Sequence, residues 1–141
     1  MPIVQRLSEL PAWGAELLET APVAHLALLD EGGHPRVQPV TFALLADTLV
    51  TAIDAKPKQA TPARIKRLQQ DPRATLTVDR YADDWTRLAW VQVLATATVG
   101  ELGDAARTAL QAKYPQYATT PLTGPLITLS PLRVLCWRAS G

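Results

Sequence analysis

Six basic side chains lie close together in the stretch DAKPKQATPARIKRLQQDPRA, between Asp54 and Ala74. Half of the 14 lysine and arginine residues fall between Lys56 and Arg80, although the net charge of the whole chain is only +1. A phosphate carries about −1.5 to −2 charges near neutral pH. Lysine binds it as a point charge, and arginine can bind it with two parallel hydrogen bonds. The stretch is therefore either a solvated helix face or a binding site for an anion.

Two pairs in this stretch have the spacing of a phosphate site. Lys56 and Lys58 are separated only by Pro57, which stiffens the loop and reduces the entropy lost on binding. Arg64 and Arg67 are about one helical turn apart. Exposed ion pairs stabilise a fold by only about 0–1 kcal/mol each. A charge density beyond the needs of folding therefore favours a ligand.

Other chemical signatures are absent from the sequence. It contains no glycine-rich dinucleotide fingerprint, no phosphate-loop motif and no nucleophile elbow. His25 and His34 have no partners at metal-binding spacing, and Asp83-Asp84 is typical of a solvated loop. No catalytic residue is assigned and no metal site is predicted. These absences fit hydride transfer by a bound organic cofactor, which needs orientation, shielding and electrostatics from the protein.

The elements that must position these residues are mostly strands. Apolar and β-branched runs predict strands over 23–29, 36–45, 47–54, 73–81, 87–102 and 126–139, the last as one or two strands. Helices are expected over 11–19, 61–70 and 104–114. Hairpin-linked strands dominate, and regular strand–helix alternation is absent. We therefore expect one mainly β (α+β) domain over residues 1–141, a six- to seven-stranded antiparallel barrel with two or three short helices.

Local signals refine this prediction. Thr61 and Pro62 read as the N-cap and first residue of the basic helix, and Ile65 and Leu68 should face the core. Pro39, in the middle of a strand, cannot donate a ladder hydrogen bond. It indicates an edge strand, a bulge, or a backbone that faces a ligand.

Composition narrows the class of protein. No apolar run approaches the roughly 20 residues of a membrane span, and the N-terminus lacks the apolar region of a secretory signal. Cys136 is the single cysteine, so no internal disulfide can form and a reducing cytoplasm is expected. The basic stretch is short and lacks interleaved aromatic residues. Neither nucleic acid nor a membrane is therefore expected as a partner.

Four segments, taken in order, resemble a known family. They are VAHLALLDEGGHPRVQPVTFAL, DTLVTAIDAKPK, RIKRLQQDPRATLTVDRYADDW and RLAWVQVLATATV, and the resemblance covers roughly residues 20–138. The family is the pyridoxamine 5′-phosphate oxidase-like split β-barrel family, which binds FMN or a deazaflavin. The sequence most closely resembles its branch of small proteins that use coenzyme F-420. The resemblance implies a homodimer with cofactor sites at the subunit interface.

The resemblance also implies the positions of the cofactor contacts. They are Val37, Gln38, Pro39, Val40, Thr51, Ala52, Lys56, Lys58, Arg64, Arg67, Arg87 and Trp90. The strand 37–40 would lie along the tricyclic ring, with residues 51–52 near the ring and the ribityl chain. The two lysines would bind the phosphate. The two helical arginines would complete that site or hold the glutamate tail of a deazaflavin. Arg87 and Trp90 would reach the cofactor of the partner subunit.

Two positions depart from the family pattern. Asp71-Pro72 stands where Asn-Pro is common, which changes a helix end. Ala95 stands where glycine is common, and its methyl group would narrow the cleft and alter the substrate shape. Trp85 and Trp90 are read either as cleft residues or as core or dimer contacts.

The function expected from the resemblance is hydride transfer between F-420 and a small organic substrate. One alternative is an FMN-dependent oxidase or reductase of the same fold. Another is a non-catalytic binding protein for a flavin, a deazaflavin, haem or another tetrapyrrole.

Overall fold

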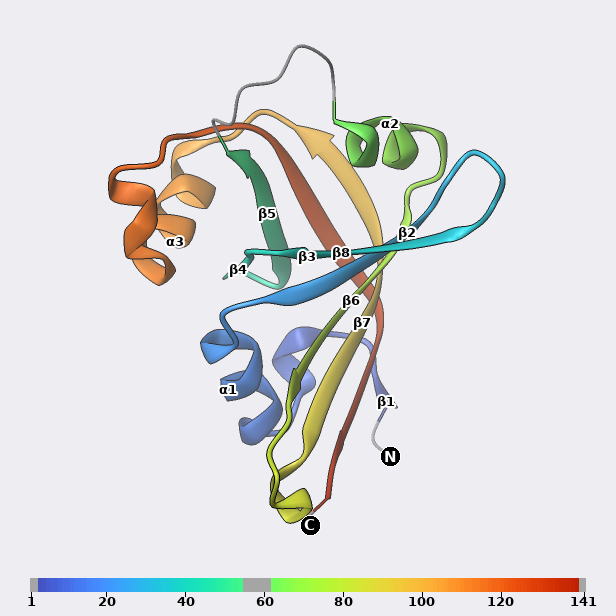
Figure 1. Ribbon diagram of the computed structural model, residues 1–141, viewed down its shortest axis with the longest axis vertical. Coiled ribbons are helices and arrows are strands. Elements are labelled where there is room, and N and C mark those ends of the chain that lie inside the picture. Colours follow the sequence, from blue (N-terminus) through green and yellow to red (C-terminus); the bar gives the residue numbers. More distant parts are fainter. Residues whose placement is uncertain (1–2, 55–61, 140–141) are drawn as a thin grey trace.

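The computed structural model of the chain describes residues 3–54 and 62–139 (Figure 1). Within these residues the strands are β1 (Ile3–Val4), β2 (Ala24–Leu29), β3 (Pro35–Val40), β4 (Ala43–Leu45), β5 (Thr48–Asp54), β6 (Arg73–Arg80), β7 (Ala89–Gly100) and β8 (Leu122–Arg138). The helices are α1 (Ala12–Thr20), α2 (Ala63–Gln70) and α3 (Asp104–Lys113), with short 3₁₀ helices η1 (Leu7–Glu9), η2 (Trp85–Arg87) and η3 (Pro115–Ala118). The strand pairs are antiparallel, which confirms the predicted fold class.

The two edges of the sheet are consecutive in the chain. The strand order is β3-β2-β6-β7-β8-β5-β4, with β1 beside β8. Only Thr41 and Phe42 connect β3 to β4, and three Cα steps span at most about 11 Å. The edges must therefore approach each other, although no ladder joins β3 to β4 in the described chain. The sheet curls into a barrel with an open seam, which is the split barrel that the resemblance implies.

Strand β5 is covered on both faces, which explains its nearly continuous apolar sequence. Leu49 and Ile53 belong to the core cluster inside the barrel. Val50 and Ala52 pack in a second cluster with Leu110 of α3. Figure 1 shows α3 on one side of β5 and α2 on the other. Strand β5 therefore lies between the two helical regions that border the seam.

Apolar residues at helical spacing fix α1 and α2 to the barrel. Leu17 and Leu18 of α1 are buried, and so are Ile65 and Leu68 of α2, as their spacing predicts. Helix α2 contacts β2 and β7. The basic helix is therefore held at the end of the barrel by its apolar side, which leaves its remaining faces for polar contacts.

The strand expected over 36–45 is broken at Thr41-Phe42. The side chain of Phe42 is fully buried in the barrel core. The chain turns here, and β4 then starts on the opposite edge of the sheet. Valine, threonine and phenylalanine all favour strands, so the pattern could not show the break. The C-terminal segment forms one strand, and an irregular register with β7 accommodates Pro131.

The start of each of the three helices differs by one residue from the prediction. Pro11, the expected first residue of α1, is its N-cap, and the helix begins at Ala12. Pro62 has an extended backbone, with ψ at 144°, and is the N-cap of α2 rather than its first helical residue. Thr61 lies outside the described residues. Aspartate is a favoured N-cap, so Asp104 at the start of the expected helix is predicted to cap it. In the structure Gly103 is the N-cap of α3, and Asp104 is the first helical residue. Asp104 still lies in the first turn, where a carboxylate favours the helix dipole.

Pro39 lies on an edge strand. Among the described strands, β3 pairs only with β2, where Pro39 is opposite His25. An edge position has a free side, so a missing N–H can leave the ladder intact. The edge interpretation is confirmed.

Candidate functional site

A hollow of about 220 Å³ lies at the seam of the barrel, and we call it the split hollow. It is lined by residues from β3, the β3–β4 connection, β5, α2, η3 and the segment before β2. These residues are Val23, Pro39, Val40, Thr41, Thr51, Ala52, Arg64 and Tyr117. The polar side chains among them are one guanidinium and three hydroxyls, and none of the eight is a carboxylate. The hollow therefore offers hydrogen-bond donors and one positive charge.

Five of the predicted cofactor-binding residues meet in the split hollow. They are Pro39, Val40, Thr51, Ala52 and Arg64. Val37 and Gln38 lie on β3 but do not line the hollow, and Val37 is 61% exposed. The structure thus brings together the strand residues and the basic helix that are far apart in the sequence.

The two arginines of α2, which are predicted to act together at one anion site, lie in different surroundings. Arg64 is half-buried and lines the split hollow. Arg67 is only 9% exposed, does not line the hollow, and its Nε atom has no hydrogen-bond partner among the described residues. Arg67 belongs with Ile65 and Leu68 to the buried side of the helix, whereas Arg64 lies at the hollow. Lys56 and Lys58 lie outside the described residues.

Arg87 and Trp90 lie away from the split hollow of their own chain. Arg87 is exposed in η2, and Trp90 on β7 is directly opposite Trp137 on β8. Trp85 is 68% exposed, so it is neither a core residue nor a lining residue of the split hollow. A contact of Arg87 or Trp90 with a cofactor therefore requires a second subunit.

Sequence reasoning missed Thr41 and Tyr117. Both line the split hollow, and their hydroxyl oxygens are 2.5 Å apart. Tyr117 belongs to η3, within a segment expected to be a loop. The available signal was the three-residue spacing of Tyr114 and Tyr117, whose rings meet edge to face with centroids 5.7 Å apart. That spacing could not show that the rings face the β3–β4 connection.

The end of α3 fixes the β3–β4 connection. The N–H of Phe42 donates to the hydroxyl of Tyr114 at 3.1 Å, and this hydroxyl donates to the carbonyl of Pro22 at 2.9 Å. The Lys113 ammonium lies 3.6 Å from the centroid of the Phe42 ring. It also donates to the Leu18 carbonyl at 3.3 Å. That carbonyl lacks the usual helical donor four residues later, because proline has no N–H.

Burial changes the acidity of both supporting residues. It lowers the pKa of Lys113 to about 8. It also raises the pKa of Tyr114, so the hydroxyl stays protonated and can donate. One wall of the split hollow is therefore held by a small polar network that titrates only at alkaline pH.

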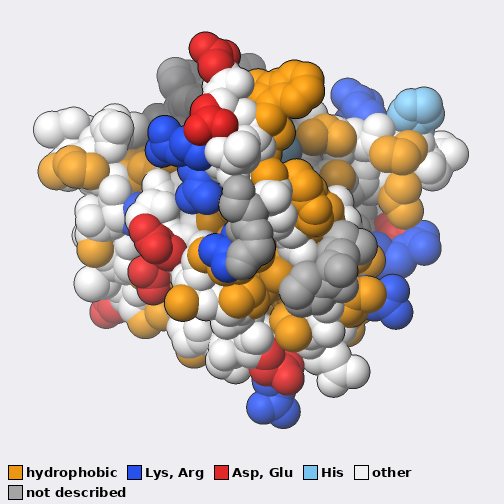
Figure 2. All heavy atoms as spheres, turned by 90° about the horizontal axis from the view of Figure 1, so that it is seen from below, with side chains coloured by type: hydrophobic (Ala, Val, Ile, Leu, Met, Phe, Trp, Pro, Cys, Tyr) orange, Lys and Arg blue, Asp and Glu red, His pale blue; other side chains and the backbone are white. Residues whose placement is uncertain are grey.

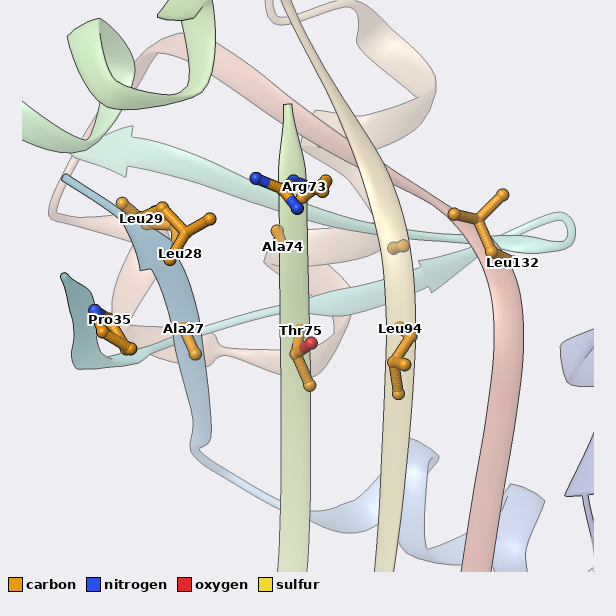
Figure 3. A pocket seen from close by; sticks show the side chains of 10 residues that line it. Ala27, Leu28, Leu29, Pro35, Arg73, Ala74, Thr75, Leu94 and Leu132 are labelled. Atoms are coloured by element: carbon orange, nitrogen blue, oxygen red, sulfur yellow. The ribbon is translucent and has the colours of Figure 1, made fainter. Parts of the chain in front are cut away.

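A second hollow, of about 380 Å³, lies on the outer face of the sheet, and we call it the outer hollow (Figure 3). Its lining residues are Ala27, Leu28, Leu29, Pro35, Arg73, Ala74, Thr75, Leu94, Ala95 and Leu132. Ala27, Thr75 and Leu94 are neighbours across β2, β6 and β7, and Figure 3 shows them side by side. Arg73 donates twice to Asp71, at 3.0 and 2.7 Å, which lowers the pKa of that carboxyl to about 2. The positive charge of Arg73 is therefore balanced by a carboxylate of the same chain.

The surface at the end of the molecule where β1 begins and β8 ends carries charges of both signs. Figure 2 shows acidic and basic side chains interspersed with hydrophobic ones on this face. A field of one sign, as polyanion binding requires, is therefore not seen there. Within residues 3–54 and 62–139, no three His, Cys, Asp or Glu side chains are grouped so that they could hold a metal ion. None of the described helices is long and apolar enough to cross a bilayer.

Several solved structures share the fold at low sequence identity. A haem-binding protein from Mycobacterium smegmatis has a TM-score of 0.69 and 22% identity, over 93% of this chain and 55% of that chain. An FAD-binding protein from Mesorhizobium loti has a TM-score of 0.65 and 17% identity, over 96% and 97%. An F-420 reductase has a TM-score of 0.61 and 22% identity, over 89% and 98%. At these identities the likeness concerns the fold alone.

The family is established at the level of the sequence. Residues 13–136 match the family model described as pyridoxamine 5′-phosphate oxidase. No curated protein matches the chain. Because the family match spans most of the 141 residues and agrees with the split barrel, the chain belongs to the pyridoxamine 5′-phosphate oxidase family.

Proposed function

We propose that this protein is an oxidoreductase that transfers a hydride between the deazaflavin coenzyme F-420 and a small organic substrate. The observation that carries the proposal is the split hollow, where Pro39 and Thr51 meet Arg64. Membership of the family and the shared fold of an F-420 reductase support a cofactor of the flavin type. F-420 supplies the hydride chemistry, so the protein has to hold the ring, shield it and present one face.

The chemistry of the split hollow fits part of such a cofactor. Hydroxyl and guanidinium donors suit carbonyl and phosphate oxygens, and no lining carboxylate would repel an anion. Its volume of about 220 Å³ is below the roughly 300–1,000 Å³ of most ligand pockets. The described residues of one chain therefore enclose only part of the cofactor. We assign the rest to the segment with Lys56 and Lys58 and to a second copy of the chain.

The proposed second copy lies on the outer face of the sheet. The outer hollow is mainly apolar, and Leu132 in its lining is 62% exposed. Val37, which is opposite the lining residue Ala27 in the sheet, is 61% exposed. Apolar surface of this kind is typical of protein interfaces. Arg87 and Trp90 do not line the split hollow of their own chain, so a homodimer would let them reach the site of the partner.

FMN is the second candidate cofactor. An FAD-binding protein shares the fold, and the donors of the split hollow suit the phosphate of any flavin. A haem-binding protein also shares the fold. Haem has less support, because the lining contains no histidine, cysteine or methionine to ligate iron. Tyrosine can also ligate haem iron, but the Tyr117 hydroxyl is hydrogen-bonded to Thr41.

A parallel titration of the purified apoprotein with F-420 and FMN tests the proposal. We expect Lys58→Ala and Arg64→Ala each to weaken binding at least tenfold, which is about 1.4 kcal/mol. Lys66→Ala is the matched control, because this lysine is exposed on the same helix and does not line the hollow. Affinities that stay at the wild-type value in both test variants would refute the phosphate site.

The same protein distinguishes the alternatives. FMN that copurifies would give a yellow preparation, whereas expression in a host without F-420 should give colourless apoprotein. Loss of the absorbance of bound, oxidised F-420 when a reduced substrate is added would demonstrate hydride transfer. F-420 that binds but never exchanges a hydride would favour the non-catalytic binding protein.

A further inference from the structure

The hydroxyl pair of Thr41 and Tyr117 has one proton more than its own bond needs. The two oxygens are 2.5 Å apart, and either one can be the donor. Each hydroxyl carries one proton and accepts through its lone pairs. One proton lies between the two oxygens, so the other O–H is left to donate to a third group. Both residues line the split hollow, and a ligand there is such a group.

The hydroxyl of the neighbouring Tyr114 makes both of its hydrogen bonds with backbone groups. The hydroxyl of Tyr114 accepts from the N–H of Phe42 and donates its single proton to the carbonyl of Pro22. It therefore fixes the β3–β4 connection and does not line the split hollow. Tyr114 and Tyr117 are three residues apart and their rings touch. The two neighbouring tyrosines therefore have different roles. The hydroxyl of Tyr114 supports the scaffold, and the hydroxyl of Tyr117 faces the split hollow.

The remaining polar side chains of the hollow, Thr51 and Arg64, lie on β5 and α2. Arg64 comes from α2, which Figure 1 shows on the opposite side of β5 from α3. The 3₁₀ helix η3 with Tyr117 follows α3 directly. A phosphate held at Arg64 would leave the other end of the ligand near the hydroxyl pair. An uncharged donor at that end suits a carbonyl oxygen better than a phosphate.

We infer that the Thr41–Tyr117 pair donates a hydrogen bond to a carbonyl oxygen of the bound flavin or deazaflavin ring and so orients the ring in the split hollow. The inference rests on the proposed function, since it needs a cofactor of this class. Two-electron reduction increases the electron density on the ring oxygens. A donor at this place therefore binds the reduced ring more tightly than the oxidised ring and raises the reduction potential of the bound cofactor.

The test measures the affinity for FMN, riboflavin and F-420, and the potential of each bound cofactor, in Thr41→Val and Tyr117→Phe. We expect affinity for FMN and riboflavin to fall by the same factor, about threefold to tenfold. If the reduced form loses threefold more than the oxidised form, the potential falls by ~14 mV. Arg64→Ala should weaken FMN but not riboflavin, because riboflavin has no phosphate. Tyr114→Phe, the control, should lower the melting temperature and leave the potential unchanged.

The outcomes separate this inference from the proposed function. Wild-type affinity and potential in both hydroxyl variants would overturn the inference and leave the proposed function standing. Wild-type protein that binds none of FMN, riboflavin and F-420 would overturn both. Thr41→Val keeps the shape of the side chain, so it gives a result even if Tyr117→Phe fails to fold.

Discussion

The two hollows of this molecule are built in different ways and carry different chemistry. The split hollow collects its residues from strands, a strand connection and two helical segments, and its polar groups are donors. The outer hollow lies on the face of the sheet, where Ala27, Thr75 and Leu94 are neighbours by register. Its one arginine is paired with Asp71. The first hollow therefore suits an acceptor-rich ligand, and the second suits an apolar protein surface.

The difference shows where the fold leaves room for function. A seam is unavoidable when two consecutive strands occupy opposite edges of one sheet. The seam brings a two-residue connection next to β5 and α2, and polar side chains gather there. The outer hollow is lined mainly by apolar side chains, so specificity there must come mostly from shape and apolar contact. Each of the following changes should affect one hollow and spare the other.

The largest expected effect is the loss of the buried ring that anchors the seam. Phe42→Ala should lower the free energy of unfolding by about 3–5 kcal/mol, because the side chain is fully buried in the barrel core. Urea denaturation measures this. Leu132→Ala, at the rim of the outer hollow and 62% exposed, should change monomer stability by less than about 0.5 kcal/mol. Equal losses of unfolding free energy in Phe42→Ala and Leu132→Ala would contradict the proposed difference between the seam and the outer face.

The next effect should appear only on the outer face. Leu94→Glu places a charge among apolar residues of the outer hollow, so it should weaken dimerisation by about 2 kcal/mol or more and leave the monomer folded. Light scattering over a concentration series measures the association. Gln111→Glu on α3 adds the same charge at an exposed position away from this face and should change nothing. A wild-type protein that is monomeric with cofactor bound at micromolar concentration would remove the basis of this prediction.

A smaller effect concerns Lys113, which supports the seam and makes the stability of the protein depend on pH in the alkaline range. The pKa of Lys113 is about 8 in the folded protein because of burial, against 10.5 when unperturbed. Between these values the unfolded chain binds more protons, so stability should rise with pH. Because the ammonium is only partly buried, we expect the free energy of unfolding to rise over this pH range by about 1 kcal/mol more in the wild type than in Lys113→Met. Parallel pH curves of unfolding for the two proteins would show that this site does not titrate as described.

The smallest effect belongs to the ion pair at the rim of the outer hollow. Arg73 lowers the pKa of Asp71 to about 2 from 3.8 through hydrogen bonds. Its stabilising effect should be complete above pH 4 and be lost as the pH falls towards 2. The melting temperatures of wild type and Asp71→Asn should therefore differ slightly at pH 6 and converge at pH 2. Cofactor affinity should be unchanged, since Asp71 and Arg73 do not line the split hollow.

The sequence predicted the fold better than it predicted the site. Hydrophobic periodicity located the helices and most strands, and it assigned Ile65 and Leu68 to the core correctly. It could not show the break at Thr41-Phe42, because those residues favour strands and only the closure of the barrel makes the chain turn there. The side of α2 that faces the hollow also depends on packing.

Residues at the site differed in how visible they were in the sequence. Pro39 was visible, because a proline within a strand restricts the structures that are possible. Arg64 was visible through the local density of charge. Tyr117 was not, because its role arises from the packing of α3 and η3 against the β3–β4 connection, which lies 76 residues away in the chain. Long-range contacts of this kind leave no local pattern.

The central claim is that the split hollow is the cofactor site. A crystal structure of the protein with F-420 or FMN bound tests it most directly. We predict that the ring lies at the seam between β3 and β5, with its phosphate near Arg64 and a ring oxygen within hydrogen-bond distance of Thr41 or Tyr117. A cofactor bound only in the outer hollow, or one that contacts none of these three residues, would contradict the account.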